Sequence, residues 1–151
     1  MAQPLYCYEA EVEWTGQRKG QLRSRSLLSI EVGAPPEFQG HEGIWTPEHF
    51  FVGSVASCYM TTFVAIAELS KLDFISFRCA ARASLEKLEG QGYQVTKITL
   101  APTVVLRNER DHDRASRILE KAEKNCFISN SIKSEVVLEP TVLFAAAAEA
   151  R

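Results

Sequence analysis

The sequence predicts an α+β domain with an antiparallel sheet, a long buried central helix and a second, shorter helix. Several segments alternate apolar and polar residues, which is typical of half-buried strands. Residues 47 to about 70 are nearly all apolar or small, as in a helix buried inside a protein. From about residue 111 a charged segment carries apolar residues at helical spacing. The order strand, strand, helix, strand, strand, helix, strand is that of an α+β fold.

Length and composition indicate one domain, residues 1–151, with a frayed tail at about 144–151. The chain is 46% apolar and 24% charged, with a formal charge of −2. This size is enough for a hydrophobic core, and this charge gives no support for binding nucleic acid. The N-terminus lacks the pattern of a secretory signal, so we expect a cytoplasmic protein.

The first two predicted strands cover residues 5–14 and about 21–32, and "TGQRKG" forms the turn between them. The Gly- and Pro-containing segment "GAPPEFQGHEG" then predicts a loop.

Thr46 is expected to cap the long helix, with Pro47 at its first position and Glu48 in its first turn. The helix is long enough to span a membrane. Its Gly, Ser and Thr residues and its flanking acids favour burial in a protein, so we expect no membrane contact.

Two further strands are predicted at about 74–88 and 93–107, joined at "EGQG". Helix two follows from about 111 and ends at Cys126, and a last strand covers about 134–143. The inward residues of the first of these strands are Phe77, Cys79, Ala81, Ala83 and Leu85.

An all-apolar helix needs cover on every side, whereas one sheet covers one face. We therefore expect a homodimer in which two long helices meet, with close approach permitted at Gly53, Ala56 and Ser57. The alternative is a helix buried within one monomer.

The four cysteines, at 7, 58, 79 and 126, form no CxxC or metal-type spacing, so no metal site is expected. Each is by default a small buried hydrophobic residue and a free thiol.

Cys58 has three possible partners that suggest chemistry. Arg18 lies on a turn, Glu48 is costly to bury without a partner, and Cys126 lies at a helix end where its thiol could be exposed. Glu48 and Cys58 are about 15 Å apart on a straight helix, so they cannot touch. An arginine bridges them, or the helix starts later, or the groups come from opposite subunits.

Apolar residues beside these groups are candidate walls of a substrate pocket, although core packing explains them equally well. They are Trp45, Phe50, Phe51, Phe127 and Ile128. His41 and His49 are expected to be a solvated loop residue and a helix-end residue, not proton shuttles.

"TPEHFFVGSVASC" resembles the "NPE…C" signature of the OsmC/Ohr family of thiol-dependent hydroperoxide reductases, with the cysteine ten residues after the glutamate. "NCFISNSI" resembles the second cysteine motif of the family, and "TGQRKG" places Arg18 at the position of its catalytic arginine. Two features depart from the family pattern: Phe127 replaces the usual proline, and "GHEGIW" replaces a glycine-rich lead-in.

The resemblance implies an intertwined homodimer with two interface sites and a peroxidase cycle without metal, haem or flavin. Cys58 would form a sulfenate with an organic hydroperoxide, and Cys126 would convert it to a disulfide. Arg18 would lower the pKa of Cys58, and Glu48 would orient Arg18. A dithiol reductant, a lipoyl group or small thiol, would reset the enzyme.

Two other functions were considered. One is a non-catalytic dimeric module that binds an apolar ligand in the interface pocket. The other is a redox sensor, which no DNA-binding helix or basic patch supports.

Overall fold

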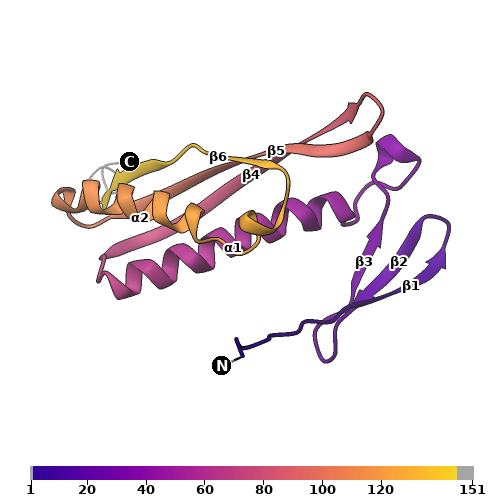
Figure 1. Ribbon diagram of the computed structural model, residues 1–151, viewed down its shortest axis with the longest axis horizontal. Coiled ribbons are helices and arrows are strands. Elements are labelled where there is room, and N and C mark those ends of the chain that lie inside the picture. Colours follow the sequence, from indigo (N-terminus) through magenta and orange to yellow (C-terminus); the bar gives the residue numbers. More distant parts are fainter. Residues whose placement is uncertain (1, 146–151) are drawn as a thin grey trace. The chain divides into compact units, whose positions relative to one another are not determined.

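The computed structural model describes residues 2–145, and the chain divides into two compact units, Met1–Phe50 and Phe51–Arg151 (Figure 1). The α+β class is confirmed, and the two helices lie where they were predicted, but two of the predicted strands are each divided into two elements. The single domain of residues 1–151 stays a prediction. Of the tail, Phe144 belongs to a strand, and residues 146–151 lie outside the described residues.

The first unit holds a three-stranded antiparallel sheet of β1 (Glu11–Gly16), β2 (Lys19–Arg23) and β3 (Ile30–Gly33). The prediction that a strand begins at residue 5 is wrong, because β1 starts where its partner β2 ends, with Glu11 opposite Arg23. The predicted strand 21–32 is interrupted. Arg25 has a φ of 45°, and the Leu27 N–H donates to the Ser24 carbonyl at 2.9 Å, so the chain turns there.

The loop after β3 contains a short 3₁₀ turn, η1 (Pro36–Phe38), and closes tightly at Gly40. A Cβ at residue 40 would lie 1.7 Å from the Ala34 carbonyl oxygen, so only glycine fits. The Ala34 N–H donates to the Arg18 carbonyl at 3.2 Å, which ties this loop to the β1–β2 turn.

Helix α1 (Pro47–Leu69) begins as predicted. The Thr46 hydroxyl accepts the His49 N–H at 3.2 Å, and the Thr46 N–H donates back to His49 Nδ1 at 3.3 Å. These reciprocal bonds make Thr46 the N-cap and fix His49 as part of the cap.

Within a single chain, α1 is buried along one face of the helix, whereas the sequence predicted burial on every side. Its fully buried side chains are Val55, Tyr59, Phe63 and Ala67. Met60 and Leu69 remain 42% and 85% exposed. The helix has a mean hydropathy of 1.7 and enough length to cross a membrane. The buried core helices of soluble proteins meet the same two criteria, so length and hydropathy alone do not indicate a membrane span.

The second unit is built on a long antiparallel hairpin, β4 (Phe74–Leu88) and β5 (Gly92–Leu106), close to the predicted bounds. Alternate residues of β5 are buried, including Ile98, Leu100, Val104 and Leu106. The expected inward position of Leu85 is wrong: it is 39% exposed, because the register shifts between Ser84 and Leu85.

A short 3₁₀ turn, η2 (Glu109–Asp111), leads into α2 (His112–Lys124), whose buried stripe is the predicted one of Ala115, Ile118, Leu119 and Ala122. The predicted last strand is divided into two, β6 (Glu135–Leu138) and β7 (Thr141–Phe144). Both pair parallel to β5. A wholly antiparallel sheet is therefore not found. The reason is that α2 carries the chain back before β6, as a parallel crossover requires.

Two prolines mark the gap between β6 and β7. Pro140 separates the two strands, and Pro102 lies in β5 between the residues that pair with β6 and those that pair with β7. A proline has no N–H to donate, so it is tolerated where the ladder is interrupted. The Glu139 N–H still donates to the Leu100 carbonyl at 2.8 Å and keeps the chain on the sheet.

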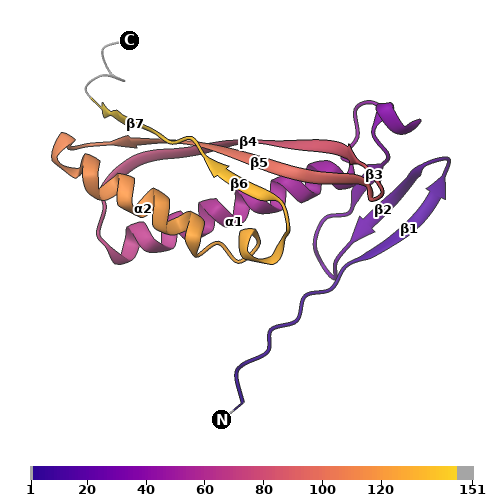
Figure 2. The same cartoon turned by 45° about the horizontal axis from the view of Figure 1, so that its top comes forward.

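In the second unit α1 and α2 lie side by side on one face of the β4–β5–β6 sheet (Figures 1 and 2). The buried Tyr59 hydroxyl donates to the Leu119 carbonyl at 2.9 Å, and Arg114 Nη1 donates to the Ser70 carbonyl at 2.9 Å. The start of α2 is thereby fixed beside the end of α1, so the two helices run in opposite directions.

The aromatic cluster under α1 predicts a stability test. Phe63 is fully buried, with its ring stacked 4.6 Å from Phe77. We expect Phe63→Ala to lower the free energy of unfolding by about 3–5 kcal/mol. Denaturant unfolding at one fixed protein concentration measures this change. Phe127→Ala is the control, because Phe127 is 79% exposed. Equal losses in the two variants would contradict this description of the core.

Candidate active site

Two cysteines that are far apart in the sequence meet between the helices of the second unit. Cys58 lies on α1, and Cys126 follows the end of α2. The Cys126 thiol donates a hydrogen bond to the Cys58 sulfur, and both cysteines are free. The antiparallel packing of α1 and α2 therefore brings a half-buried thiol and a fully buried thiol into contact.

The surroundings of Cys58 favour its thiolate. Burial alone raises the pKa of Cys58, but several hydrogen bonds to the sulfur outweigh it and hold the pKa below the ordinary value. The donors to the sulfur are the Ile128 N–H, the Cys126 thiol and the Phe127 N–H. The Thr62 hydroxyl, which donates to the Cys58 carbonyl at 2.8 Å, also lowers the pKa. Donors aimed at an anion stabilise it, so they increase the ionised fraction near neutral pH.

Cys126 is shifted in the opposite direction. Burial raises the pKa of Cys126, and the neighbouring Cys58 sulfur raises it further, against the lowering effect of the Ser129 hydroxyl and N–H. Of the two thiols, Cys58 therefore has the lower pKa and loses its proton first. The expectation of an exposed Cys126 is wrong, because the chain folds over it and leaves its exposed fraction at 0%.

The donors to Cys58 come from a tight turn after α2. The Asn130 N–H donates to the Cys126 carbonyl at 3.0 Å, and the Ser131 N–H donates to the Ile128 carbonyl at 2.9 Å, within η3 (Ser129–Ser131). These bonds hold the backbone in a compact arc. Two successive N–H groups then point at the same sulfur, as in an anion-binding nest.

A cavity of about 430 Å³ opens beside Cys58. Its walls come from α1, from the end of α2 and from the turn that follows, and most of the lining is apolar. The lining residues are Cys58, Thr61, Thr62, Ala65, Ile66, Leu69, Lys121, Asn125 and Phe127.

Arg18 and Glu48 both belong to the first unit, where they form no ion pair with each other in the described chain. Arg18 donates instead to the Phe38 carbonyl and to Gln39 Oε1, both at 3.2 Å. Glu48 Oε2 is buried and has no hydrogen-bond partner within residues 2–145. A buried carboxylate oxygen without a donor is unusual and indicates an incomplete site.

The predicted pocket walls divide between the two units. In the first unit Trp45 stacks on Phe50 with ring centroids 5.6 Å apart. In the second, the side chains of Phe51 and Ile128 pack against the core, while Phe127 is exposed and lines the Cys58 cavity.

The other cysteines lie elsewhere. Burial raises the pKa of Cys79 to about 11, which keeps this thiol neutral, and Cys7 is exposed on the N-terminal segment. No group of three metal-binding side chains occurs among the described residues.

Sequence reasoning missed several partners of the two sulfurs. Thr62 follows Cys58 by one helical turn, so its spacing was a usable signal. No sequence signal marks Ser129 or the N–H groups of Phe127 and Ile128, because the direction of these donors depends on the conformation of the turn. Nothing in the sequence distinguishes Lys121 from the other charged residues of the second helix.

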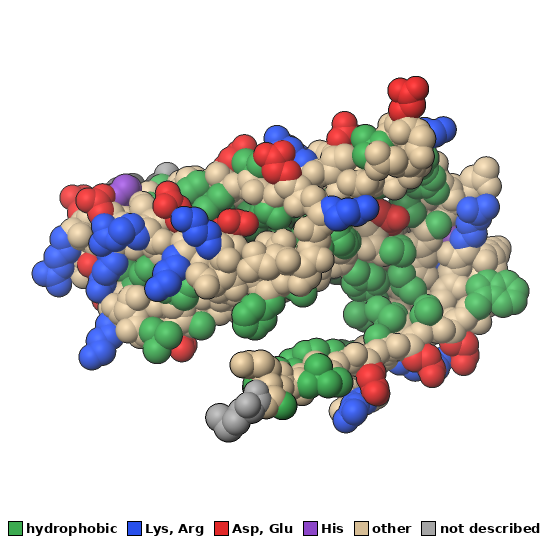
Figure 3. Space-filling view, viewed as in Figure 1, with side chains coloured by type: hydrophobic (Ala, Val, Ile, Leu, Met, Phe, Trp, Pro, Cys, Tyr) green, Lys and Arg blue, Asp and Glu red, His purple; other side chains and the backbone are tan. Residues whose placement is uncertain are grey.

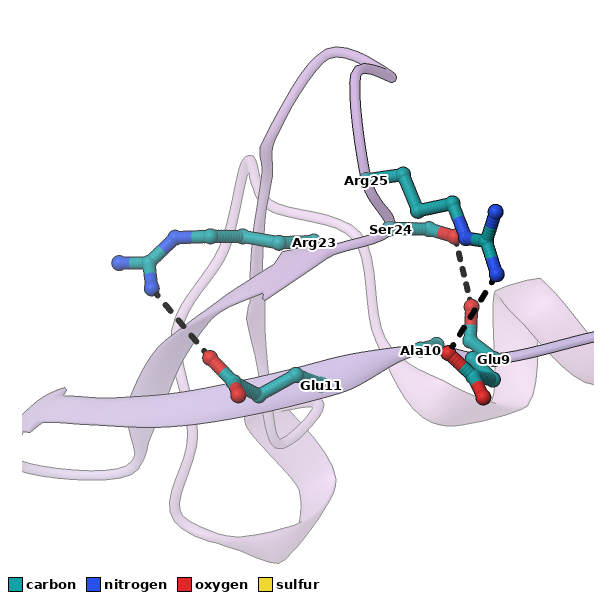
Figure 4. A pocket seen from close by; sticks show the side chains of 6 residues that line it. All are labelled: Glu9, Ala10, Glu11, Arg23, Ser24 and Arg25. Carbon is teal, nitrogen blue, oxygen red and sulfur yellow. Dashed lines mark hydrogen bonds and ion pairs between the residues drawn. The ribbon is translucent and has the colours of Figure 1, made fainter.

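A second cavity, of about 530 Å³, lies in the first unit, and no thiol is among the residues that line it (Figure 4). Arg23 and Arg25 line it, 3.7 Å from Glu11 and 3.9 Å from Glu9 respectively. Ser24 donates to the Glu9 carbonyl at 2.6 Å. These charges are satisfied by one another, so the Cys58 cavity is the better candidate for chemistry.

The chain is similar to several known proteins over most of its length. It is 28% identical over 134 residues to the uncharacterised YmaD protein of Bacillus subtilis, covering 85% of this chain and 88% of that protein. It is 24% identical over 139 residues to the peroxiredoxin OsmC of Escherichia coli, covering 87% and 93%.

Solved structures share the fold. An OsmC-like protein of unknown function from Vibrio cholerae superposes with a TM-score of 0.83 at 26% identity, covering 90% of this chain and 99% of that one. An organic hydroperoxide resistance protein from Legionella pneumophila gives a TM-score of 0.72 at 23% identity, covering 93% and 99%.

The family model described as OsmC-like protein matches residues 40–141, a range that contains Glu48, Cys58 and Cys126. On this match, and with the fold found in its solved relatives, the chain belongs to the OsmC-like family.

Proposed function

We propose that the protein is a thiol-dependent peroxidase that reduces organic hydroperoxides to alcohols. The observation that carries the proposal is the contact between Cys58 and Cys126, whose pKa values are shifted in opposite directions, beside an apolar cavity. A thiolate next to a protonated thiol is what the two steps of such a cycle need. The names of the similar Escherichia coli and Legionella proteins agree with this chemistry.

The first step is attack by the Cys58 thiolate on the outer oxygen of the hydroperoxide. A sulfur–oxygen bond forms as the oxygen–oxygen bond breaks, and the alkoxide leaves as an alcohol after taking a proton. The sulfur loses two electrons and becomes a sulfenic acid. The Ile128 and Phe127 N–H groups would stabilise the thiolate before the attack.

The second step forms the disulfide. The Cys126 sulfur attacks the sulfenic sulfur of Cys58, a sulfur–sulfur bond replaces the sulfur–oxygen bond, and water leaves with the Cys126 proton. The two sulfurs are already in contact, so the step needs little movement. A dithiol of the cytoplasm, a lipoyl group or small thiol, would then return both residues to thiols.

We also propose a homodimer. Large hydrophobic side chains are exposed along the first unit and on α1, and Figure 3 shows hydrophobic side chains on the surface of the first unit. They include Leu5, Tyr6, Tyr8, Trp14, Leu27, Leu28, Met60 and Leu69. A second copy would cover these exposed apolar side chains, since contiguous apolar patches on a protein surface often mark interfaces.

In the dimer we propose that an arginine at position 18 reaches the active cysteine and pairs with Glu48. The support is the buried Glu48 oxygen that lacks a donor in the single chain. A guanidinium satisfies a carboxylate with two parallel hydrogen bonds and keeps its charge at all working pH values.

Intact mass after peroxide treatment tests the cycle. With one equivalent of cumene hydroperoxide the wild type should lose two hydrogens, as a Cys58–Cys126 disulfide forms. Cys126→Ser should gain one oxygen and stop after one turnover, and Cys58→Ser should consume no peroxide. Cys79→Ser is the control and should behave as wild type. A wild type that consumes no peroxide, or forms no such disulfide, would contradict the proposal.

The role of Arg18 has a separate test. We expect Arg18→Gln to slow alkylation of Cys58 at pH 7 by about tenfold, because a nearby cation lowers a thiol pKa by about one unit or more. Lys19→Gln is the matched control, since it removes the same charge from the adjacent residue. If both variants match the wild type, Arg18 does not activate Cys58.

A second candidate function is binding of an apolar ligand without chemistry, which the apolar lining of the cavity favours. It predicts ligand binding that Cys58→Ser and Cys126→Ser leave unchanged, together with no loss of peroxide. The peroxide assay therefore separates the two candidates.

A further inference from the structure

We propose that Lys121 makes the Cys58 cavity selective for hydroperoxides that carry a negatively charged group. The inference rests on the peroxidase function proposed above and names a substrate class for that site. Lys121 is the one cation among the described residues that line the cavity, and no carboxylate lines it.

The charge of Lys121 is available to a ligand. Lys121 forms no ion pair with any carboxylate of the described chain, whereas Arg114, on the same helix, is paired with Asp111 at 3.2 Å. The main-chain carbonyl of Lys121 accepts the Asn125 side-chain amide at 2.8 Å, which fixes the last turn of α2 beside the cavity. The flexible lysine stem then carries an ammonium group at an apolar wall, where it can pair with a ligand carboxylate.

The position of Lys121 sets the shape of the preferred ligand. Since α2 runs antiparallel to α1, the residues before Cys126 lie progressively further from Cys58 along the groove. Lys121 precedes Asn125 by one helical turn, which is about 6 Å along the axis. A ligand with its peroxide at the Cys58 sulfur would reach the Lys121 ammonium through a short alkyl chain ending in a carboxylate.

The expected preference is modest because Lys121 is exposed to solvent. Ion pairs at a protein surface change a binding constant by a factor of about two to five, and salt screens them. An uncharged hydroperoxide has no charge to pair with Lys121, so it serves as the reference substrate in the same cavity.

The test compares 6-hydroperoxyhexanoate with its methyl ester, which differ in charge but share the reacting end. In wild type at low salt we expect kcat/KM to be about two- to fivefold higher for the acid. Lys121→Gln should remove this difference, and Lys121→Glu should reverse it. The quantity compared is the ratio of kcat/KM for the acid to kcat/KM for the ester within each variant, so that a general loss of activity is not mistaken for lost selectivity.

Lys124→Gln is the matched control. It removes the same charge from the same helix, and Lys124 does not line the cavity. We expect it to retain the preference for the acid. If Lys124→Gln and Lys121→Gln have equal effects, or if wild type has no preference, the inference is wrong while the peroxidase function stands.

A binding measurement makes the test independent of turnover. NMR titration with 6-hydroxyhexanoate and with its methyl ester should give tighter binding of the acid in wild type, with shifts at the cavity residues, and equal binding in Lys121→Gln. If no hydroperoxide is consumed but this result holds, the peroxidase function fails and the anion preference of the cavity is supported. Equal binding of acid and ester in wild type would overturn the inference.

Discussion

The contact between the sulfurs of Cys58 and Cys126 is the interaction on which the rest of the site depends. One thiol donates a hydrogen bond to the other, which lowers the pKa of Cys58 and raises that of Cys126. The contact exists because α1 and α2 pack side by side in opposite directions, fixed by Tyr59 and Arg114. Helix packing thus determines which of two chemically identical groups has the lower pKa.

The turn after α2 adds a second constraint. It directs the Phe127 and Ile128 N–H groups to Cys58 while it buries Cys126. A proline at position 127 would have no N–H to offer, so phenylalanine supplies a donor that proline cannot. Its side chain meanwhile lines the cavity. One residue therefore acts on the nucleophile through its backbone and on the pocket through its ring.

Much of the fold was predictable from the sequence, because strong local signals were present. Thr46 and Pro47 marked the start of α1, and the alternating residues of β4 and β5 predicted their hairpin. The parallel pairing of β6 and β7 was not predictable, because it depends on where α2 returns the chain. The predicted strands are interrupted at Arg25 and at Pro140. Both interruptions follow from the local backbone conformation, which the pattern of apolar residues does not show.

The candidate site was predictable only in part. Cys58 and Cys126 were identified by spacing and resemblance, but the direction of each pKa shift required the positions of backbone donors. Arg18 binds the Phe38 carbonyl and Gln39 within its own unit, and Glu48 keeps an unpaired buried oxygen. No sequence pattern reveals such an incomplete pairing, since it depends on which donors the folded chain brings to the carboxylate.

The most direct measurement is the pH dependence of alkylation, resolved by peptide mass for each cysteine of the reduced protein. A free thiol has a pKa near ~8.5. Cys58 should react with a midpoint below that value, and Cys126 with a midpoint above it, because the two shifts have opposite signs. If Cys126 reacts at the lower pH, or both follow one curve, the proposed division of roles between the two sulfurs is wrong.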